Sequence, residues 1–148
     1  MTTIGPNGYV LAKGDGERIW FLGTLMTVKA GNAQTHGGFT VLEQTTPPAS
    51  QLRRTSTTRR KRPFTCWTGQ LHVTCGEQTR TADRGSFVFL PRGIPHAFSV
   101  VGTHGAKPQI TSPAGFEQFA AEAGERATTP TLPPAGEPNI PTFADQDC

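Results

Sequence analysis

The sequence has few cysteines and lacks any long apolar run. Its three cysteines are Cys66, Cys75 and Cys148, an odd number without the spacing of a disulfide framework, which favours a reducing, cytoplasmic location. No apolar segment approaches the roughly 20 residues of a membrane-spanning helix. Residues 1–6 have neither the basic start nor the apolar core of a signal peptide. We therefore expect a cytoplasmic protein without a membrane partner.

The chain is also short of apolar residues, but it is rich in turn formers. Only 34% of its 148 residues are hydrophobic, whereas 17 are glycine and 13 are proline, which favours many short strands joined by turns. This length allows one domain with a single core. Phe116, Phe119, Ala120 and Ala123 fall at helical spacing and predict one short C-terminal helix. We predict an all-β domain over residues 1–126 and a Pro-rich extended tail over residues 127–148.

Alternation in the middle of the chain gives more local expectations. Residues 71–75 alternate between apolar and polar side chains, which predicts a half-buried strand with His72 facing solvent and Cys75 as a small core residue. His36 lies in a glycine-rich segment and is expected to be exposed. Residues 107–111 predict only a poor strand, because Pro108 interrupts it.

The most informative stretch is residues 85–100, GSFVFLPRGIPHAFSV. It begins with the turn residue Gly85 and continues as an apolar and aromatic run typical of a buried strand. Pro91 cannot donate to a strand ladder and ends that strand, and Gly93 permits a tight reversal. His96 then opens a second run. An imidazole after such a rigid turn has few rotamers open to it, as a metal ligand or proton carrier requires.

This stretch resembles the second signature of the cupins: a glycine, five residues, Pro-x-Gly, two residues and a histidine. Gly85, Pro91, Gly93 and His96 match that pattern. The resemblance implies a small jelly-roll barrel over residues 8–124, with the short helix covering one open end. It also gives His96 the role of one of four metal ligands.

Residues 113–119, PAGFEQF, resemble the segment that follows the barrel in bacterial cupins related to quercetin dioxygenases. That branch implies a divalent metal (iron, nickel, copper or manganese) that activates dioxygen toward a small aromatic, flavonol-like substrate. Its ligands are two histidines and a glutamate from a first motif and one histidine from the second.

The first motif lacks its ligands in this chain. Counting back from Gly69, which stands at the glycine of the motif, the glutamate position is Arg62 and the two histidine positions are Thr57 and Thr55. Two neutral hydroxyls and a permanent cation cannot bind a metal as two histidines and a glutamate do. His96 is therefore the one family ligand retained, and we expect the metal to be absent or weakly bound.

A shifted reading frame accounts both for the missing ligands and for an unusual charge pattern. Six of the 14 basic residues lie within residues 53–62. If the codons before Thr55 and Thr57 end in C, reading one base earlier turns both threonines into histidine, and an AAG AGG pair at residues 61–62 gives glutamate in place of Arg62. We hypothesise that residues 52–68 are the family segment translated one nucleotide out of frame. The coding DNA tests this, because another base before either threonine would leave the basic segment as native.

Three interpretations of function stay open. The first is a dioxygenase-like cupin that is metal-deficient and inactive as written. The second is a metal-free cupin that binds a small apolar ligand in the barrel lumen. The third is an interaction protein that presents residues 53–62 to phosphates or acidic lipids. Because a charge run is a signal of low specificity, we do not expect nucleic acid as a partner. Whether the domain forms a homodimer stays open.

Overall fold

The computed structural model describes residues 2–4, 8–48, 64–91, 94–102 and 104–134. These residues form short strands and two helices, so the predicted all-β class is confirmed. In chain order the elements are β1 (Thr2–Ile4), β2 (Gly8–Val10), β3 (Glu17–Phe21), β4 (Thr24–Ala30), α1 (Asn32–Thr35), β5 (Thr40–Thr45), β6 (Phe64–Thr68), β7 (Leu71–Cys75), β8 (Gln78–Ala82), β9 (Phe87–Val88), β10 (His96–Val100), β11 (Lys107–Ser112), α2 (Phe116–Ala123) and β12 (Glu125–Arg126).

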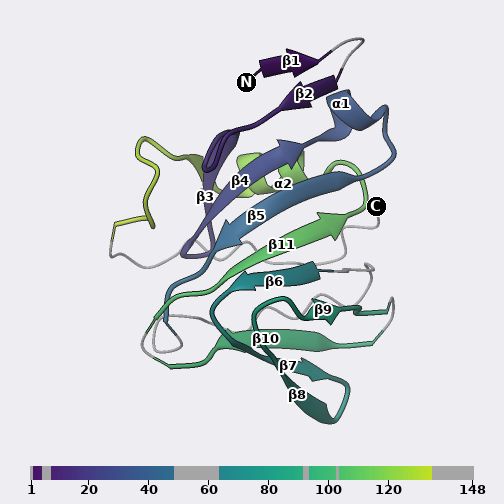
Figure 1. Cartoon of the computed structure of the whole chain (residues 1–148), viewed down its shortest axis with the longest axis vertical. Helices are drawn as coiled ribbons and strands as arrows, with labels where there is room; N and C mark the ends of the chain where they lie inside the picture. Colours follow the sequence, from purple (N-terminus) through teal and green to yellow (C-terminus); the bar gives the residue numbers. More distant parts are fainter. Residues whose placement is uncertain (1, 5–7, 49–63, 92–93, 103, 135–148) are drawn as a thin grey trace.

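The strands form one large and one small antiparallel sheet (Figure 1). The large sheet has seven strands in the order β12-β3-β4-β5-β11-β6-β9, and the small sheet has three in the order β10-β7-β8. The late strand β11 pairs with both β5 and β6, so the chain returns to the middle of a sheet that it had already begun. Such non-sequential pairing is the connectivity of a jelly roll. A separate two-stranded ribbon joins β1 and β2.

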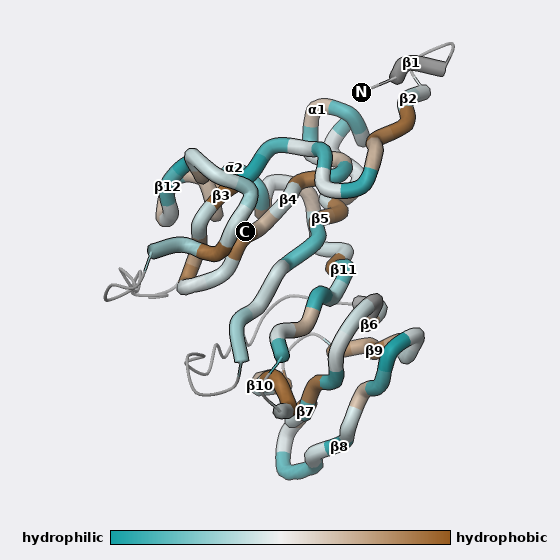
Figure 2. The backbone as a smooth tube through the Cα atoms, turned by 60° about the vertical axis from the view of Figure 1, so that its left-hand side comes forward, coloured by the Kyte–Doolittle hydropathy of each residue, from teal (hydrophilic) through white to brown (hydrophobic). Residues whose placement is uncertain are grey.

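One core connects the two sheets and α2. Leu42 lies opposite Ile110 across β5 and β11, and both are almost completely buried. From the small sheet, Leu71 and Val100, which are partners across β7 and β10, join the same cluster. Figure 2 shows the apolar, brown stretches of β7 and β10 side by side. The burial of these paired side chains supplies the main stabilisation of the fold.

The predicted C-terminal helix is confirmed as α2, which ends at Gly124. It packs against β3, β5 and β12 of the large sheet, where Phe116 and Phe119 contact the ring of Phe21 edge-on at centroid distances of 6.2 and 5.9 Å. We expected this helix to cover an open end of a barrel, and it lies instead along one part of the large sheet. No helix in the described part of the chain is long and apolar enough to cross a membrane.

The prediction that proline breaks residues 107–111 is wrong. These residues lie in β11, a six-residue strand between β5 and β6. The register against β6 shifts between Lys107 and Pro108, and such a bulge takes the missing N–H out of the ladder. Pro108 is also almost fully buried, so its apolar ring contributes to the packing of the interior.

The prediction of a buried strand after Gly85 is also wrong. Only Phe87 and Val88 pair, as β9, and Phe87 and Phe89 are 67% and 53% exposed, whereas Leu90 is buried. The burial alternates along this segment, because Val88 and Leu90 pack toward the core whereas Phe87 and Phe89 point to the other face. Successive side chains of an extended chain point to opposite faces, so a segment that is covered on one face only buries every second residue.

Candidate functional site

His96 is the first residue of β10 and is only 5% exposed. Its Nδ1 lies 3.2 Å from the carbonyl oxygen of Ile94. Because a carbonyl can only accept, this contact favours the tautomer with the proton on Nδ1. The amide of Gly76 donates to the carbonyl of Pro95 at 2.9 Å and fixes the chain just before the strand. The expectation that His96 opens a strand is confirmed, and its role as a metal ligand stays a prediction.

A thiol is the cross-strand neighbour of His96, and an amide lies one strand further on. His96 lies opposite Cys75 across β10 and β7, and Cys75 lies opposite Gln78 across β7 and β8. Directly opposite residues share a face of the sheet, with Cβ atoms about 5 Å apart. Val73, two residues before Cys75, belongs to the core, which marks this face as the interior. Cys75 itself is partly buried and packs against the core, in agreement with its prediction.

The other three histidines lie away from the cross-strand set of His96, Cys75 and Gln78. His72 is exposed on the opposite face of β7, where its Nδ1 is 3.2 Å from Oγ1 of Thr81. His36 is exposed at the end of α1, with a left-handed φ of 51°. His104 is exposed in the loop before β11. The predicted exposure of His36 and His72 is confirmed.

The described residues do not fit a cupin metal centre. Among them, no three His, Cys, Asp or Glu side chains converge as a metal site would require. The family positions Thr55, Thr57 and Arg62 lie outside the described residues, as does Gly93, and their chemistry is known only from the sequence. Hydroxyls and a guanidinium are poor partners for a divalent metal. We therefore derive no reaction step through a metal for the chain as written.

The two motif glycines occupy turns with nearly the same backbone. Gly69 has φ of 80° and Gly85 has φ of 85°, a conformation that favours glycine. The amide of Gly85 donates to the carbonyl of Cys66 at 2.6 Å, which ties the start of the second motif to β6. Burial, and secondarily the charge of Asp83, raises the pKa of the Cys66 thiol. A neutral, fully buried thiol is a core residue and does not act as a nucleophile.

A pocket of about 470 Å³ lies between β7, β8 and the segment of residues 86–90. Its lining mixes apolar and aromatic side chains with a few polar ones and one cation: Val73, Cys75, Gln78, Arg80, Thr81, Ala82, Ser86, Phe87, Val88, Phe89 and Leu90. Pockets of this size and composition are typical of small-molecule sites. His96 does not line the pocket, but its cross-strand neighbour Cys75 does.

Sequence reasoning missed Arg80, Phe87 and Phe89 as pocket residues. The sequence indicates a strand over residues 79–82, yet the direction of Arg80 follows only from its pairing with Val73. Because side chains alternate along a strand, a shift of one residue would have turned Arg80 outward. The sequence of this strand, QTRTA, is polar at four consecutive positions and gives no alternation that would identify its inner face.

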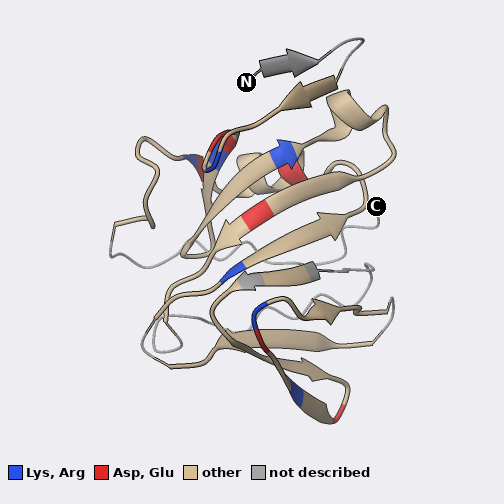
Figure 3. Ribbon diagram, viewed as in Figure 1, with Lys and Arg blue, Asp and Glu red and all other residues tan. Residues whose placement is uncertain are grey.

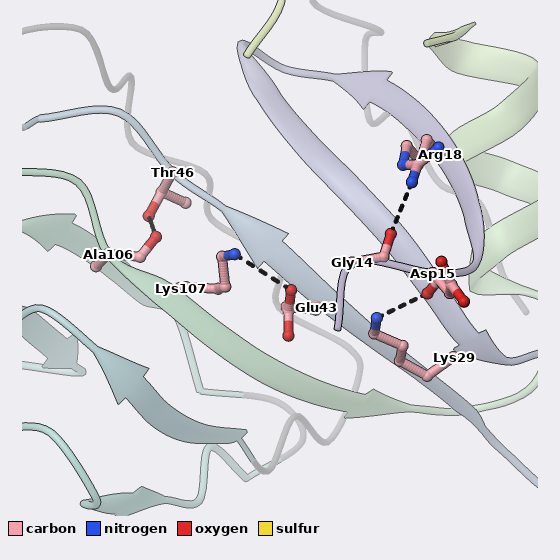
Figure 4. Close-up of polar contacts among 8 residues, drawn as sticks. All are labelled: Gly14, Asp15, Arg18, Lys29, Glu43, Thr46, Ala106 and Lys107. Atoms are coloured by element: carbon pink, nitrogen blue, oxygen red, sulfur yellow. Dashed lines mark hydrogen bonds and ion pairs between the residues drawn. The ribbon is translucent and has the colours of Figure 1, made fainter. Parts of the chain in front are cut away.

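Charged groups on the large sheet are matched locally. Nζ of Lys107 lies 3.5 Å from the largely buried carboxylate of Glu43, and Nζ of Lys29 donates to the carbonyl of Asp15 at 2.8 Å (Figure 4). Figure 3 shows the described basic and acidic residues interspersed along the ribbon, with both signs together near the start of β3. The basic residues 53–62 lie outside the described part of the chain.

No family model matches the chain, and no curated protein matches it. Solved structures do. An RmlC-like cupin from Shewanella frigidimarina superimposes with a TM-score of 0.60 at 12% identity, covering 75% of this chain and 94% of that one. A predicted oxalate decarboxylase from Thermotoga maritima gives 0.61 at 14% identity, with 72% and 99% covered. The polyketide cyclase RemF from Streptomyces resistomycificus gives 0.60 at 15% identity, with 71% and 78% covered.

These superpositions establish the fold, and identities of 12–15% leave the activity open. The resemblance that the second motif suggested therefore agrees with the three-dimensional structure, independently of the quercetin-dioxygenase branch. The chain has the same jelly-roll fold as these cupin structures.

Proposed function

We propose that this chain binds a small molecule with an apolar, ring-containing body in the pocket between β7, β8 and residues 86–90. The observation that carries the proposal is that Phe87 and Phe89, two of the most exposed large apolar residues, line the same pocket. Covering their rings removes apolar surface from water at about 25 cal/mol per Å². Aromatic walls also favour a flat ligand through stacked or edge-on contacts.

The similar structures support a small-molecule role. They include a protein titled a polyketide cyclase and one titled a predicted oxalate decarboxylase. An aromatic ligand is also the class implied by the resemblance to quercetin dioxygenases. Because the side chains at the family ligand positions Thr55, Thr57 and Arg62 are poor metal donors, we propose binding without a resident metal and no dioxygenase activity for this chain.

Binding of the neutral probe N-phenyl-1-naphthylamine tests this proposal. We expect saturable fluorescence enhancement with one site per chain. Replacing both pocket rings, Phe87→Ser with Phe89→Ser, should weaken binding about ten-fold, the effect of losing roughly 1.4 kcal/mol of apolar contact. Phe39→Ser is the matched control, because Phe39 is 46% exposed and lies outside the pocket lining. Non-saturable binding, or equal binding by the two-ring variant, would overturn the proposal.

A second candidate is a metal-dependent oxygenase whose first motif is lost through the shifted frame. The specific observation in its favour is His96, which is buried on the inner face of β10 although all three of its partner ligands in the family arrangement are absent from the sequence. This candidate predicts that restoring the missing donors restores metal binding. The third interpretation, a basic-loop interaction protein, concerns residues outside the described part of the chain and stays a prediction.

A further inference from the structure

We propose that the ligand of this pocket carries one anionic group, such as a carboxylate, which Arg80 binds. This inference rests on the pocket binding proposed above and adds the chemical class of the ligand. The ligand is an aromatic or aliphatic monocarboxylate, with its acid group at β8 and its apolar body against residues 87–90.

The backbone register directs Arg80 toward the pocket. Arg80 lies opposite Val73 across β8 and β7, and Val73 is a core residue at 6% exposure. Directly opposite side chains share a face, so the aliphatic stem of Arg80 leaves the sheet on its inner side. Both residues line the pocket. The guanidinium therefore lies at the boundary between the apolar lining and solvent, where long cationic side chains commonly extend.

The guanidinium keeps donors for a ligand. Its Nη1 donates to the carbonyl of Thr79 at 3.0 Å, which holds the group close to its own strand. A guanidinium has five N–H groups in a planar fork, so one backbone contact leaves a bidentate edge for a carboxylate.

The described lining of the pocket carries positive charge and no negative charge. Among the described residues that line the pocket, Arg80 is the single charged one. The two carboxylates nearest in sequence, Glu77 and Asp83, lie beyond the ends of β8 and are not part of the lining. Asp83 accepts a hydrogen bond from Nε2 of Gln70 instead. An apolar pocket with one cation and no acidic side chain is complementary to a ligand with one negative charge.

Neutral donors stand beside the cation. Gln78, two residues before Arg80 on β8, points to the same face, and Ser86 lines the pocket from the facing segment. An amide N–H and a hydroxyl can each donate to a carboxylate oxygen that the guanidinium leaves unsatisfied. Phe87, Phe89 and Leu90 then form the apolar end of the same pocket.

A matched pair of ligands, 1-naphthoate and 1-naphthamide, tests the inference by titration calorimetry. The two differ in charge and share the ring, so their affinity ratio isolates the anionic group. We expect the acid to bind roughly five-fold more tightly at low salt, the size of a partly exposed charge pair. Arg80→Gln should bring the ratio to one, and Arg80→Lys should keep part of it. Arg84→Gln is the control, because Arg84 is exposed and outside the lining.

The outcomes separate this inference from the function on which it rests. If both ligands bind equally well, and both lose affinity when Phe87 and Phe89 are replaced by serine, the pocket is real and the anion preference is wrong. If neither ligand binds, both proposals fail. A ratio that does not fall in 0.5 M salt would also contradict the charge pair, since exposed pairs are screened. This salt test uses the unaltered chain and holds even if Arg80→Gln does not fold.

Discussion

Glu117 joins three elements that are distant in the sequence. Its Oε1 accepts from the backbone amide of Asn32 at the start of α1, at 2.6 Å, and its Oε2 accepts from Oγ1 of Thr40 at the start of β5, at 2.5 Å. Burial alone would raise the pKa of this carboxyl, but the hydrogen bonds from Thr40 and Asn32 outweigh it and lower the pKa below its usual 4.5. The ionised form is therefore favoured in the folded state.

The sign of this shift gives a prediction about pH. A lowered folded-state pKa adds stability that is present above the unfolded-state pKa and is lost as the pH falls through the folded-state pKa. We expect Glu117→Gln to reduce the free energy of unfolding at pH 7 by about 1–2 kcal/mol, the value of hydrogen bonds to a charged acceptor. Urea unfolding at pH 7 and at pH 3 measures this, and the deficit should shrink at the lower pH.

The matched control for that prediction is Glu122→Gln, on the exposed side of the same helix. It should change stability by less than about 0.5 kcal/mol, as most surface substitutions do. An equal loss for Glu117→Gln at both pH values would show that packing, and not the ionised carboxylate, carries the contribution.

At the scale of elements, the turn before β7 is closed by a contact that only glycine permits. A Cβ on Gly69 would lie 2.8 Å from Cα of Ala106 and 2.8 Å from the carbonyl oxygen of Gly105. Ala106 in turn exchanges backbone hydrogen bonds with Thr46. The turn after β6 therefore rests directly on the chain that leads into β11. At Gly85, in contrast, a Cβ would meet nothing within 4 Å.

This difference predicts unequal effects of the same substitution. Gly69→Ala and Gly85→Ala both place alanine at a left-handed φ near 80°, which costs about 1–2 kcal/mol. Only Gly69→Ala also forces backbone apart, so we expect it to destabilise by at least about 2 kcal/mol more, as overpacking does. Denaturant midpoints of the two variants measure the difference, and equal midpoints would refute the role of the contact.

Patterns within one element were sufficient to predict α2 and the start of β10, because helical spacing and the Pro-Arg-Gly turn are local signals. They were insufficient for β9 and β11. The exposure of Phe87 depends on which face of β9 packs on the core, and the tolerance of Pro108 depends on a bulge against β6. Both are properties of the surrounding structure, which a single stretch of sequence does not contain.

At the scale of the whole molecule, one part of the candidate site follows from a local motif and the other part depends on how the strands pair. The motif around His96 indicated the fold and the buried imidazole. The pocket of Arg80, Phe87 and Phe89 required the register of three strands before it could be recognised. By the resemblance, Thr55, Thr57 and Arg62 stand at the family's ligand positions, and the sequence alone shows that their side chains are poor metal donors, because the chemistry of a donor does not depend on where the chain runs.

The last prediction concerns the metal. Four-ligand sites rely on imidazole and anionic donors that converge, and the loss of a ligand is severe. We therefore expect the chain as written to purify with less than about a tenth of a metal per chain, since it retains one family ligand, His96. The triple variant Thr55→His, Thr57→His and Arg62→Glu should bind iron, nickel, copper or manganese at close to one per chain, as measured by elemental mass spectrometry after dialysis.

His96 provides the matched control for this rescue. The same triple variant with His96→Ala should hold markedly less metal, because the buried imidazole on β10 supplies the fourth ligand in the family arrangement. Equal metal content with and without His96 would mean that the second motif preserves the turn into β10 but contributes nothing to the site. Stoichiometric metal in the unmodified chain would contradict the prediction more deeply, since it would require other donors. The exposed imidazoles of His36, His72 and His104 would then be the first to replace.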